Sequence, residues 1–161
     1  MRKKLCIIFL ALLVIYAPMP LNAADDAITV IFDGQPIEFV DQTPIIVDGR
    51  TLVPARAIFE AFGMEVQWRN DHGQRQIWAA KGDFGISMYI GFNFMSFGTF
   101  ADYYVTFRGQ TMRPFESTQV ELDVPPMLVN DRAMVPLRAI VEALDAEVEW
   151  NQETRTAVIA V

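Results

Sequence analysis

Cysteine and histidine are almost absent from this sequence. Its 161 residues include one cysteine, Cys6, and one histidine, His72. A lone cysteine cannot close an intramolecular disulfide, and one imidazole cannot form a metal site that depends on several histidines. His72 lies in the polar stretch 70–73, which predicts an exposed turn rather than a ligand. We therefore expect a chain that is stabilised by packing and holds no metal.

Positive charge is also scarce. The chain has 13 basic and 20 acidic residues, and a formal net charge of −7. Three of the basic residues and none of the acidic ones fall in residues 1–23, so the remainder has ten basic against 20 acidic residues and a net charge of −10. Because nucleic-acid binding needs a basic surface that neutralises phosphates, we expect no nucleic-acid partner.

No apolar run is long enough for an ordinary membrane span. The longest, Leu5–Tyr16, follows a positively charged start and precedes a proline-containing stretch that ends in small residues. This order predicts a secretory signal peptide at residues 1–23, cleaved after Ala23 or Ala24, with an uncleaved N-terminal anchor as the alternative. We expect a protein that is secreted or associated with a bacterial cell envelope, and that has no membrane segment once the signal is removed.

One stretch of 19 residues occurs twice. Arg50 to Trp68 reads RTLVPARAIFEAFGMEVQW, and Arg132 to Trp150 reads RAMVPLRAIVEALDAEVEW, with a constant offset of 82 positions. A short apolar run and a turn dipeptide, Asp48-Gly49 or Asn130-Asp131, precede each copy. These dipeptides tolerate the left-handed backbone of a tight turn, so each copy is predicted to begin with two short strands joined by a turn.

A short helix is predicted next in each copy. Pro54 and Pro136 suit the first turn of a helix, where the missing N–H is not needed. The apolar residues that follow are spaced i, i+3, i+4, i+7, which is one face of a helix. About nine residues of helix do not persist alone in water, so a sheet must hold it. An alternating strand, a turn and a last strand complete the predicted unit.

These features resemble the copper amine oxidase N-terminal domain family, the stalk modules of secreted and surface proteins of Gram-positive bacteria. The resemblance rests on DGRTLVPARAIFEAFGMEVQW and its echo NDRAMVPLRAIVEALDAEVEW, and runs from Val40 to Val161. It implies an α+β fold of two repeats, each a small twisted antiparallel sheet packed around one short α-helix, without catalytic residues. We place the first repeat at residues 28–83 and the second at 84–161.

The oxidase activity in the family's name is not expected here. The catalytic domain of an amine oxidase is several times longer, holds copper on three histidines and needs an Asn-Tyr-Asp/Glu motif whose tyrosine becomes a quinone. This chain has one histidine and no Asn-Tyr pair. We therefore predict a protein that is not an enzyme and has no cofactor.

Arginine and tryptophan recur at matched positions of the repeat. The arginines could contact an anion or a polysaccharide, or they could be structural, because each helix arginine precedes a glutamate by four residues and could pair with it. The tryptophans could be platforms for sugars, but they share the buried-face parity of the valine two residues before, which favours the core. Together with the two prolines, the motif residues are Arg50, Pro54, Arg56, Trp68, Arg132, Pro136, Arg138 and Trp150.

The stretch from Phe84 to Phe107 carries nine aromatic residues among 24. It departs from the family pattern by an apparent insertion at about residues 92–116. One reading is an extended hairpin that adds core to a small domain. The other is an exposed aromatic surface for a partner, because amphipathic aromatic side chains favour interfaces. The candidate ligand-binding residues are Phe97, Phe100, Tyr103 and Tyr104.

The sequence thus predicts an exported, non-catalytic binding or spacer module of the bacterial cell envelope. Its partner would be a cell-surface protein or a polysaccharide. The alternative is a carbohydrate-active accessory protein or a weak hydrolase, which would need two facing carboxylates roughly 5–10 Å apart. The identity of the ligand and the oligomeric state stay open.

Overall fold

The computed structural model describes residues 27–71 and 73–161, so the predicted signal peptide and His72 lie outside the described residues. The fold is α+β and mostly strand. The elements in chain order are β1 (Thr29–Phe32), β2 (Gln35–Pro36), β3 (Ile45–Val47), β4 (Arg50–Pro54), α1 (Ala55–Ala61), β5 (Glu65–Asp71), β6 (Gln74–Lys81), β7 (Phe84–Tyr89), β8 (Phe94–Phe100), β9 (Val105–Phe107), β10 (Gln110–Met112), β11 (Phe115–Glu121), β12 (Met127–Val129), β13 (Arg132–Pro136), α2 (Leu137–Ala143), β14 (Glu147–Asn151) and β15 (Thr156–Ala160).

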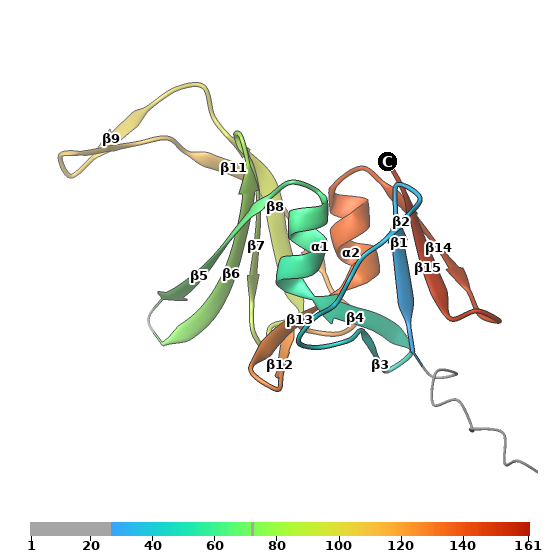
Figure 1. Cartoon of the computed structure of the whole chain (residues 1–161). Helices are drawn as coiled ribbons and strands as arrows, with labels where there is room; N and C mark the ends of the chain where they lie inside the picture. Colours follow the sequence, from blue (N-terminus) through green and yellow to red (C-terminus); the bar gives the residue numbers. More distant parts are fainter. Residues whose placement is uncertain (1–26, 72) are drawn as a thin grey trace, which may run out of the picture.

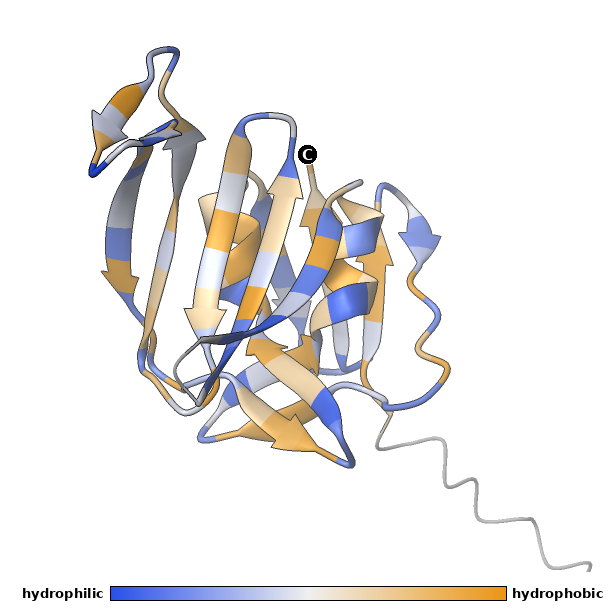
Figure 2. Ribbon diagram, turned by 90° about the vertical axis from the view of Figure 1, so that its left-hand side faces the viewer, coloured by the Kyte–Doolittle hydropathy of each residue, from blue (hydrophilic) through white to orange (hydrophobic). Residues whose placement is uncertain are grey.

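Three sheets surround the two helices. The first has the strand order β12-β13-β4-β3, the second β11-β8-β7-β6-β5 and the third β14-β15-β1-β2. Figure 1 shows α1 and α2 between the second and third sheets, with the first sheet across the ends of both. Hydrophobic and hydrophilic residues alternate along the strands in Figure 2, as expected for sheets with one buried face.

The first sheet joins the two stretches that share a sequence. Strands β4 and β13 pair antiparallel, with Val53 opposite Val135, and with Leu52 and Pro54 opposite Pro136 and Met134. Val53 and Val135 occupy the same position of the repeated sequence, and so do the residues on either side of them. The pairing therefore stays the same when the two stretches are exchanged, which places a local two-fold axis between the two valines.

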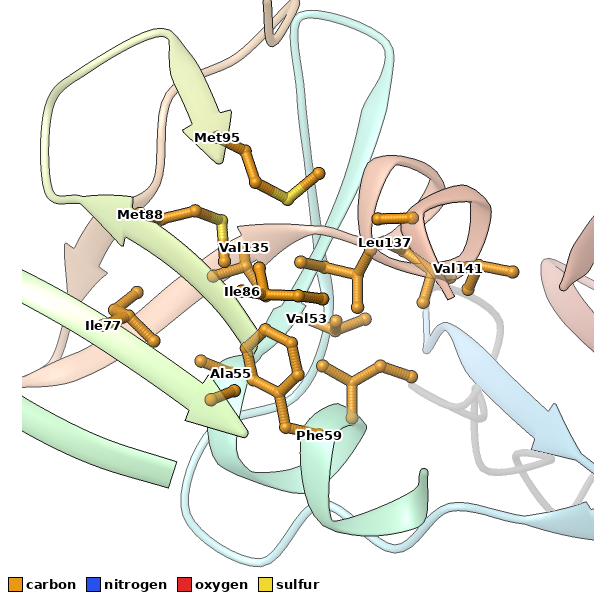
Figure 3. Close-up of a cluster of buried hydrophobic side chains, with 14 of the residues drawn as sticks. Val53, Ala55, Phe59, Ile77, Ile86, Met88, Met95, Val135, Leu137 and Val141 are labelled. Carbon is orange, nitrogen blue, oxygen red and sulfur yellow. The ribbon is translucent and has the colours of Figure 1, made fainter. Parts of the chain in front are cut away.

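The helices exchange partners across this axis. Helix α1 packs on β13 as well as on its own neighbours, and α2 packs on β4. One continuous core results, and Figure 3 shows Val53, Phe59, Val135 and Val141 within it, beside Ile77 of β6. Since each short helix is covered by a strand from the other stretch, neither stretch forms its core alone.

The local backbone follows the predicted turn and cap residues. Asp48 and Asn130 have positive φ, as tight two-residue turns require, which confirms the predicted turns. Gly63 and Asp145 also have positive φ after the helices, which is the left-handed conformation that commonly ends a helix. The helices are shorter than expected, seven residues each, and begin one residue after the prolines.

The aromatic stretch extends the second sheet. The boundary expected between residues 83 and 84 falls in the turn between β6 and β7, which pair from Gln76 opposite Tyr89 to Lys81 opposite Phe84. The expected insertion contributes β8, the hairpin β9–β10 and the start of β11. Strands β8 and β11 pair at the sheet edge, whereas β9 and β10 pair only with each other and project from the body (Figure 1).

Candidate binding groove

Two ion pairs connect the repeated stretches. Arg132 donates to Asp41 Oδ2 from Nε at 3.1 Å and from Nη2 at 2.9 Å. Arg50 donates from Nε to Asp123 Oδ2 at 2.7 Å. Asp41 and Asp123 are also separated by 82 positions, so the two pairs are equivalent under the local two-fold axis. Each pair holds the turn of one stretch against the chain that leads into the other.

A surface groove of about 800 Å³ opens beside the Arg132–Asp41 pair. Helix α1 contributes Arg56 and Glu60 to its lining, and β5 contributes Trp68. The segment 35–42 forms another wall of the groove. This volume lies in the range of about 300–1,000 Å³ that is typical of small-molecule sites. We call this concavity the Trp68 groove.

The burial predicted for Trp68 is wrong, because 46% of this residue is exposed. The predicted parity is right, since Trp68 lies opposite Ile77, a fully buried residue of β6. However, β5 is the edge strand of its sheet, and Val66 is its last residue that packs against the core. Two residues further along, the indole lies beside the outer side of α1 and lines the groove instead.

The arginines of the helices do not form the predicted intrahelical ion pairs. Within residues 27–71 and 73–161, neither Arg56 with Glu60 nor Arg138 with Glu142 comes within ion-pair distance. Both arginines are exposed, and each lines a groove. An exposed i, i+4 pair is worth only about 0.3–0.5 kcal/mol, so solvation of the long side chains competes with it easily.

A second groove of about 600 Å³ occupies the equivalent position across the axis. Arg50, Asp123, Pro136, Arg138 and Trp150 line it, at an offset of 82 from residues of the Trp68 groove. Trp150 is only partly exposed, because it packs against the core as predicted. Its indole N–H donates to Gln152 Oε1 at 2.8 Å. We call this concavity the Trp150 groove.

The four aromatic candidates do not share one surface. Phe97 packs against the core from β8. Phe100 ends the same strand on the opposite face, where its ring lies 6.1 Å from that of Trp78 and 5.2 Å from that of Phe115. A strand alternates its side chains between two faces, which separates these two residues. Neither is exposed, so packing accounts for both.

Tyr103 and Tyr104 lie before the projecting hairpin and are 55% and 67% exposed. The Tyr103 hydroxyl donates to Glu116 Oε1 at 3.2 Å. This hydrogen bond, and then the charge of the carboxylate, raise the pKa of Tyr103 above its ordinary value of 10.0. The hairpin also exposes Val105, Phe107 and Met112. Of the aromatic surfaces at Trp68 and at this hairpin, the one at Trp68 is concave.

Arg113 fastens the base of the hairpin. Its guanidinium donates to Asp83 Oδ1 at 2.8 Å and to the Ala101 carbonyl at 2.9 Å. The same group lies 5.8 Å above the ring of Phe100. These contacts fix the base of the hairpin, while β9 and β10 keep free edges.

The described part of the chain offers few other kinds of site. Within it, no three or more His, Cys, Asp or Glu side chains gather as a metal site. Neither of its two helices is long and apolar enough to cross a membrane. The groove's chemistry is therefore that of one exposed indole, two arginines and several carboxylates.

The model of the copper amine oxidase N-terminal domain matches residues 31–159. The chain belongs to this family. The match is to the N-terminal domain and not to the catalytic domain of the oxidases, and no curated protein or solved structure gives a significant match. In this copper amine oxidase N-terminal domain, both grooves lie within the matched residues.

One part of the groove had a signal in the sequence and another had none. Asp41-Gln-Thr-Pro44 and Asp123-Val-Pro-Pro126 extend the repeat upstream, with Asp and Pro at the same offset of 82. This spacing could have identified both acidic partners. No sequence motif marks the wall at residues 35–40. The position of this wall depends on β1, the strand before it, which pairs with β15 at the far end of the chain.

Proposed function

We propose that this chain is an exported, non-catalytic binding module of the bacterial cell envelope. It is built from two copies of one family unit, and the Trp68 groove is its ligand contact. The observation that carries the proposal is the exposed indole of Trp68 in a concave groove that both copies line. The family supports an accessory role, because its model describes a non-catalytic domain.

A large exposed aromatic side chain in a groove favours binding. Exposed apolar surface is common on proteins, but a concave site with an aromatic wall and a few charged groups is the usual build of a ligand site. The repeated motif places its Arg, Pro and Trp at this surface, although each residue also has a role in folding. This dual use explains how a stalk-like module can also bind.

Export is supported by the charge pattern at the start of the chain. A positive start, the run Leu5–Tyr16 and a small residue at position 23 have the order of a signal peptide. The remaining chain carries a net charge of −10, which keeps such a module soluble and away from other polyanions.

Sedimentation with envelope preparations tests the proposal. The chain from Ala24 onward, which contains every described element, is mixed with insoluble cell envelopes from a Gram-positive bacterium. We expect the native protein to sediment with the envelopes and the Trp68→Ala variant to stay in the supernatant. Native protein in the supernatant, or equal sedimentation of both, would overturn the proposal.

The aromatic residues before the hairpin supply a comparison. A variant with Tyr103 and Tyr104 both changed to Ala is expected to sediment like the native protein, because these residues lie outside the groove. If this variant stays in the supernatant and Trp68→Ala sediments, the ligand contact lies at the hairpin and not at the groove.

A further inference from the structure

We propose that the Trp68 groove binds an uncharged polysaccharide segment, with one sugar ring stacked on the indole of Trp68. This inference rests on the proposed function and assigns a ligand class to the same groove. The groove presents an apolar platform, paired hydrogen-bonding groups and a negative lining. Each of these features favours an uncharged polysaccharide.

The platform comes from Trp68 and the wall formed by the segment 35–42. Trp68 is half-exposed, and Val40, on the segment 35–42 that lines the same groove, is 91% exposed. Phe39 and Pro36 add further apolar surface to that wall. A sugar ring has a C–H face that an indole can cover and a rim of hydroxyls that need polar partners. An apolar platform between charged groups matches this amphipathic shape.

The polar groups beside the platform are held in place before a ligand arrives. Arg132 uses Nε and Nη2 on Asp41, and a guanidinium has five N–H donors, so donors remain for a ligand. The Gln42 side chain is fixed as well, since its Oε1 accepts from Asn130 at 2.9 Å. A hydroxyl both donates and accepts, so neighbouring donors and acceptors suit adjacent hydroxyls. Fixed groups also reduce the entropy lost on binding.

The charge of the lining disfavours an anionic polymer. Arg56 and Arg132 are its cations, whereas Glu38, Asp41, Glu60 and Asp131 are its anions. The lining is therefore net negative, and the chain beyond residue 23 is strongly acidic. A phosphate-bearing polymer would meet repulsion at this site, while a neutral one would not.

An extended peptide is a poorer fit than a sugar chain. Peptides that add to a sheet bind a row of free backbone groups on an edge strand. Strand β2, an edge strand beside the groove, is two residues long and ends at Pro36, which has no N–H to offer such a row. Strand β4 lies between β13 and β3, so it has no free edge. The groove instead presents side-chain donors and acceptors.

The Trp150 groove, which is equivalent to the Trp68 groove across the local two-fold axis, serves as an internal control. Its indole N–H is taken by Gln152, and the indole packs against the core. The residues equivalent to the apolar wall, 118–122, belong mostly to β11, which pairs with β8. None of them lines the Trp150 groove, so this groove has no equivalent of the apolar segment of the Trp68 groove, and we expect it to contribute little to binding.

Titration with defined soluble probes tests the inference. The native protein, Trp68→Ala and Trp150→Phe are titrated by calorimetry with a neutral hexamer of β-1,4-linked N-acetylglucosamine. Polyphosphate and an alanine-rich acidic peptide are the other two probes. Circular dichroism and thermal unfolding show that each variant is folded.

We expect the hexamer to bind the native protein and Trp150→Phe alike, and Trp68→Ala about tenfold more weakly. Polyphosphate and the peptide are expected not to bind. Binding of the hexamer that is unchanged in Trp68→Ala, or binding of polyphosphate or the peptide in place of the hexamer, would overturn the inference. If envelopes still retain the protein through Trp68 while the hexamer does not bind, the ligand class is wrong and the proposed function stands. Shortening of the hexamer during the titration would contradict the non-catalytic assignment.

Discussion

Arg50 donates from Nε to the Asp123 carboxylate at 2.7 Å, and Arg132 makes the equivalent contact with Asp41. In each pair, the arginine starts a strand of one repeated stretch and the aspartate precedes the other. The two stretches are thus joined twice at the surface and once through the paired strands β4 and β13. This reciprocity makes the molecule a single unit.

The exposed ion pairs are expected to add little stability. The side chains of Arg50 and Asp123 are 51% and 72% exposed, so water and salt screen their attraction. A double-mutant cycle with Arg50→Met and Asp123→Asn should give a coupling of about 0.2–1 kcal/mol by urea unfolding, and less at high salt. A coupling well above this range would show that the pair is a structural clamp.

The shared core predicts one cooperative unfolding transition. Ile58 and Ile140 occupy equivalent positions on α1 and α2, and both are fully buried in the same core. Ile58→Ala and Ile140→Ala should each lower the free energy of unfolding by about 2–5 kcal/mol and shift the whole transition. Fluorescence and circular dichroism should give coincident curves. Two separate transitions in either variant would mean that the halves unfold independently.

Gly98 should not tolerate a side chain. A Cβ at this position would lie 1.9 Å from the Glu116 carbonyl oxygen and 2.7 Å from Ser117 Cα, both backbone atoms of β11. Strands β8 and β11 must separate to accept it. We expect Gly98→Ala to destabilise the protein by about 1–3 kcal/mol in thermal unfolding. Thr99→Ala, an exposed change on the same strand, serves as the control and should leave the melting temperature nearly unchanged.

Tyr103 should ionise at a higher pH than an ordinary tyrosine. Glu116 accepts a hydrogen bond from the neutral phenol and repels the phenolate, which raises the pKa of Tyr103. The contribution of this contact to stability is therefore present below the ordinary pKa of 10.0 and is lost as the pH rises through the folded-state pKa. Tyrosinate absorbance should show the titration of Tyr103 moving to lower pH in Glu116→Gln. An unchanged titration would mean that the bond does not persist in solution.

The local structure was predictable because its signals are local. Positive φ at Asp48 and Gly49 follows from the residue types that tolerate it, and the helices follow from apolar spacing after a proline. The aspartates of the two ion pairs could also have been predicted, because Asp41 and Asp123 are separated by the same offset as the two repeated stretches. These features depend on neighbours in the chain or on a comparison of the chain with itself.

The burial of aromatic residues was less predictable. Alternation placed Trp68 on the correct face of β5, but whether that face is covered depends on where α1 ends against the edge strand. The same pattern leaves Trp150 packed against the core and Trp68 open to a groove. Phe97 and Phe100 lie on opposite faces of β8 for a related reason. Two residues of one strand that are an odd number of positions apart point to opposite sides of the sheet.

The repeated sequence alone is enough to assign the family, the order of strands and helices in each stretch, and the turns and caps between them. These follow from backbone preferences and from hydrophobic periodicity, which act over a few residues. The pairing of Val53 with Val135, the single core and the unequal grooves arise only in the folded molecule. They depend on contacts between segments that lie about 80 residues apart, and sequence separation carries no information about which of those surfaces will meet.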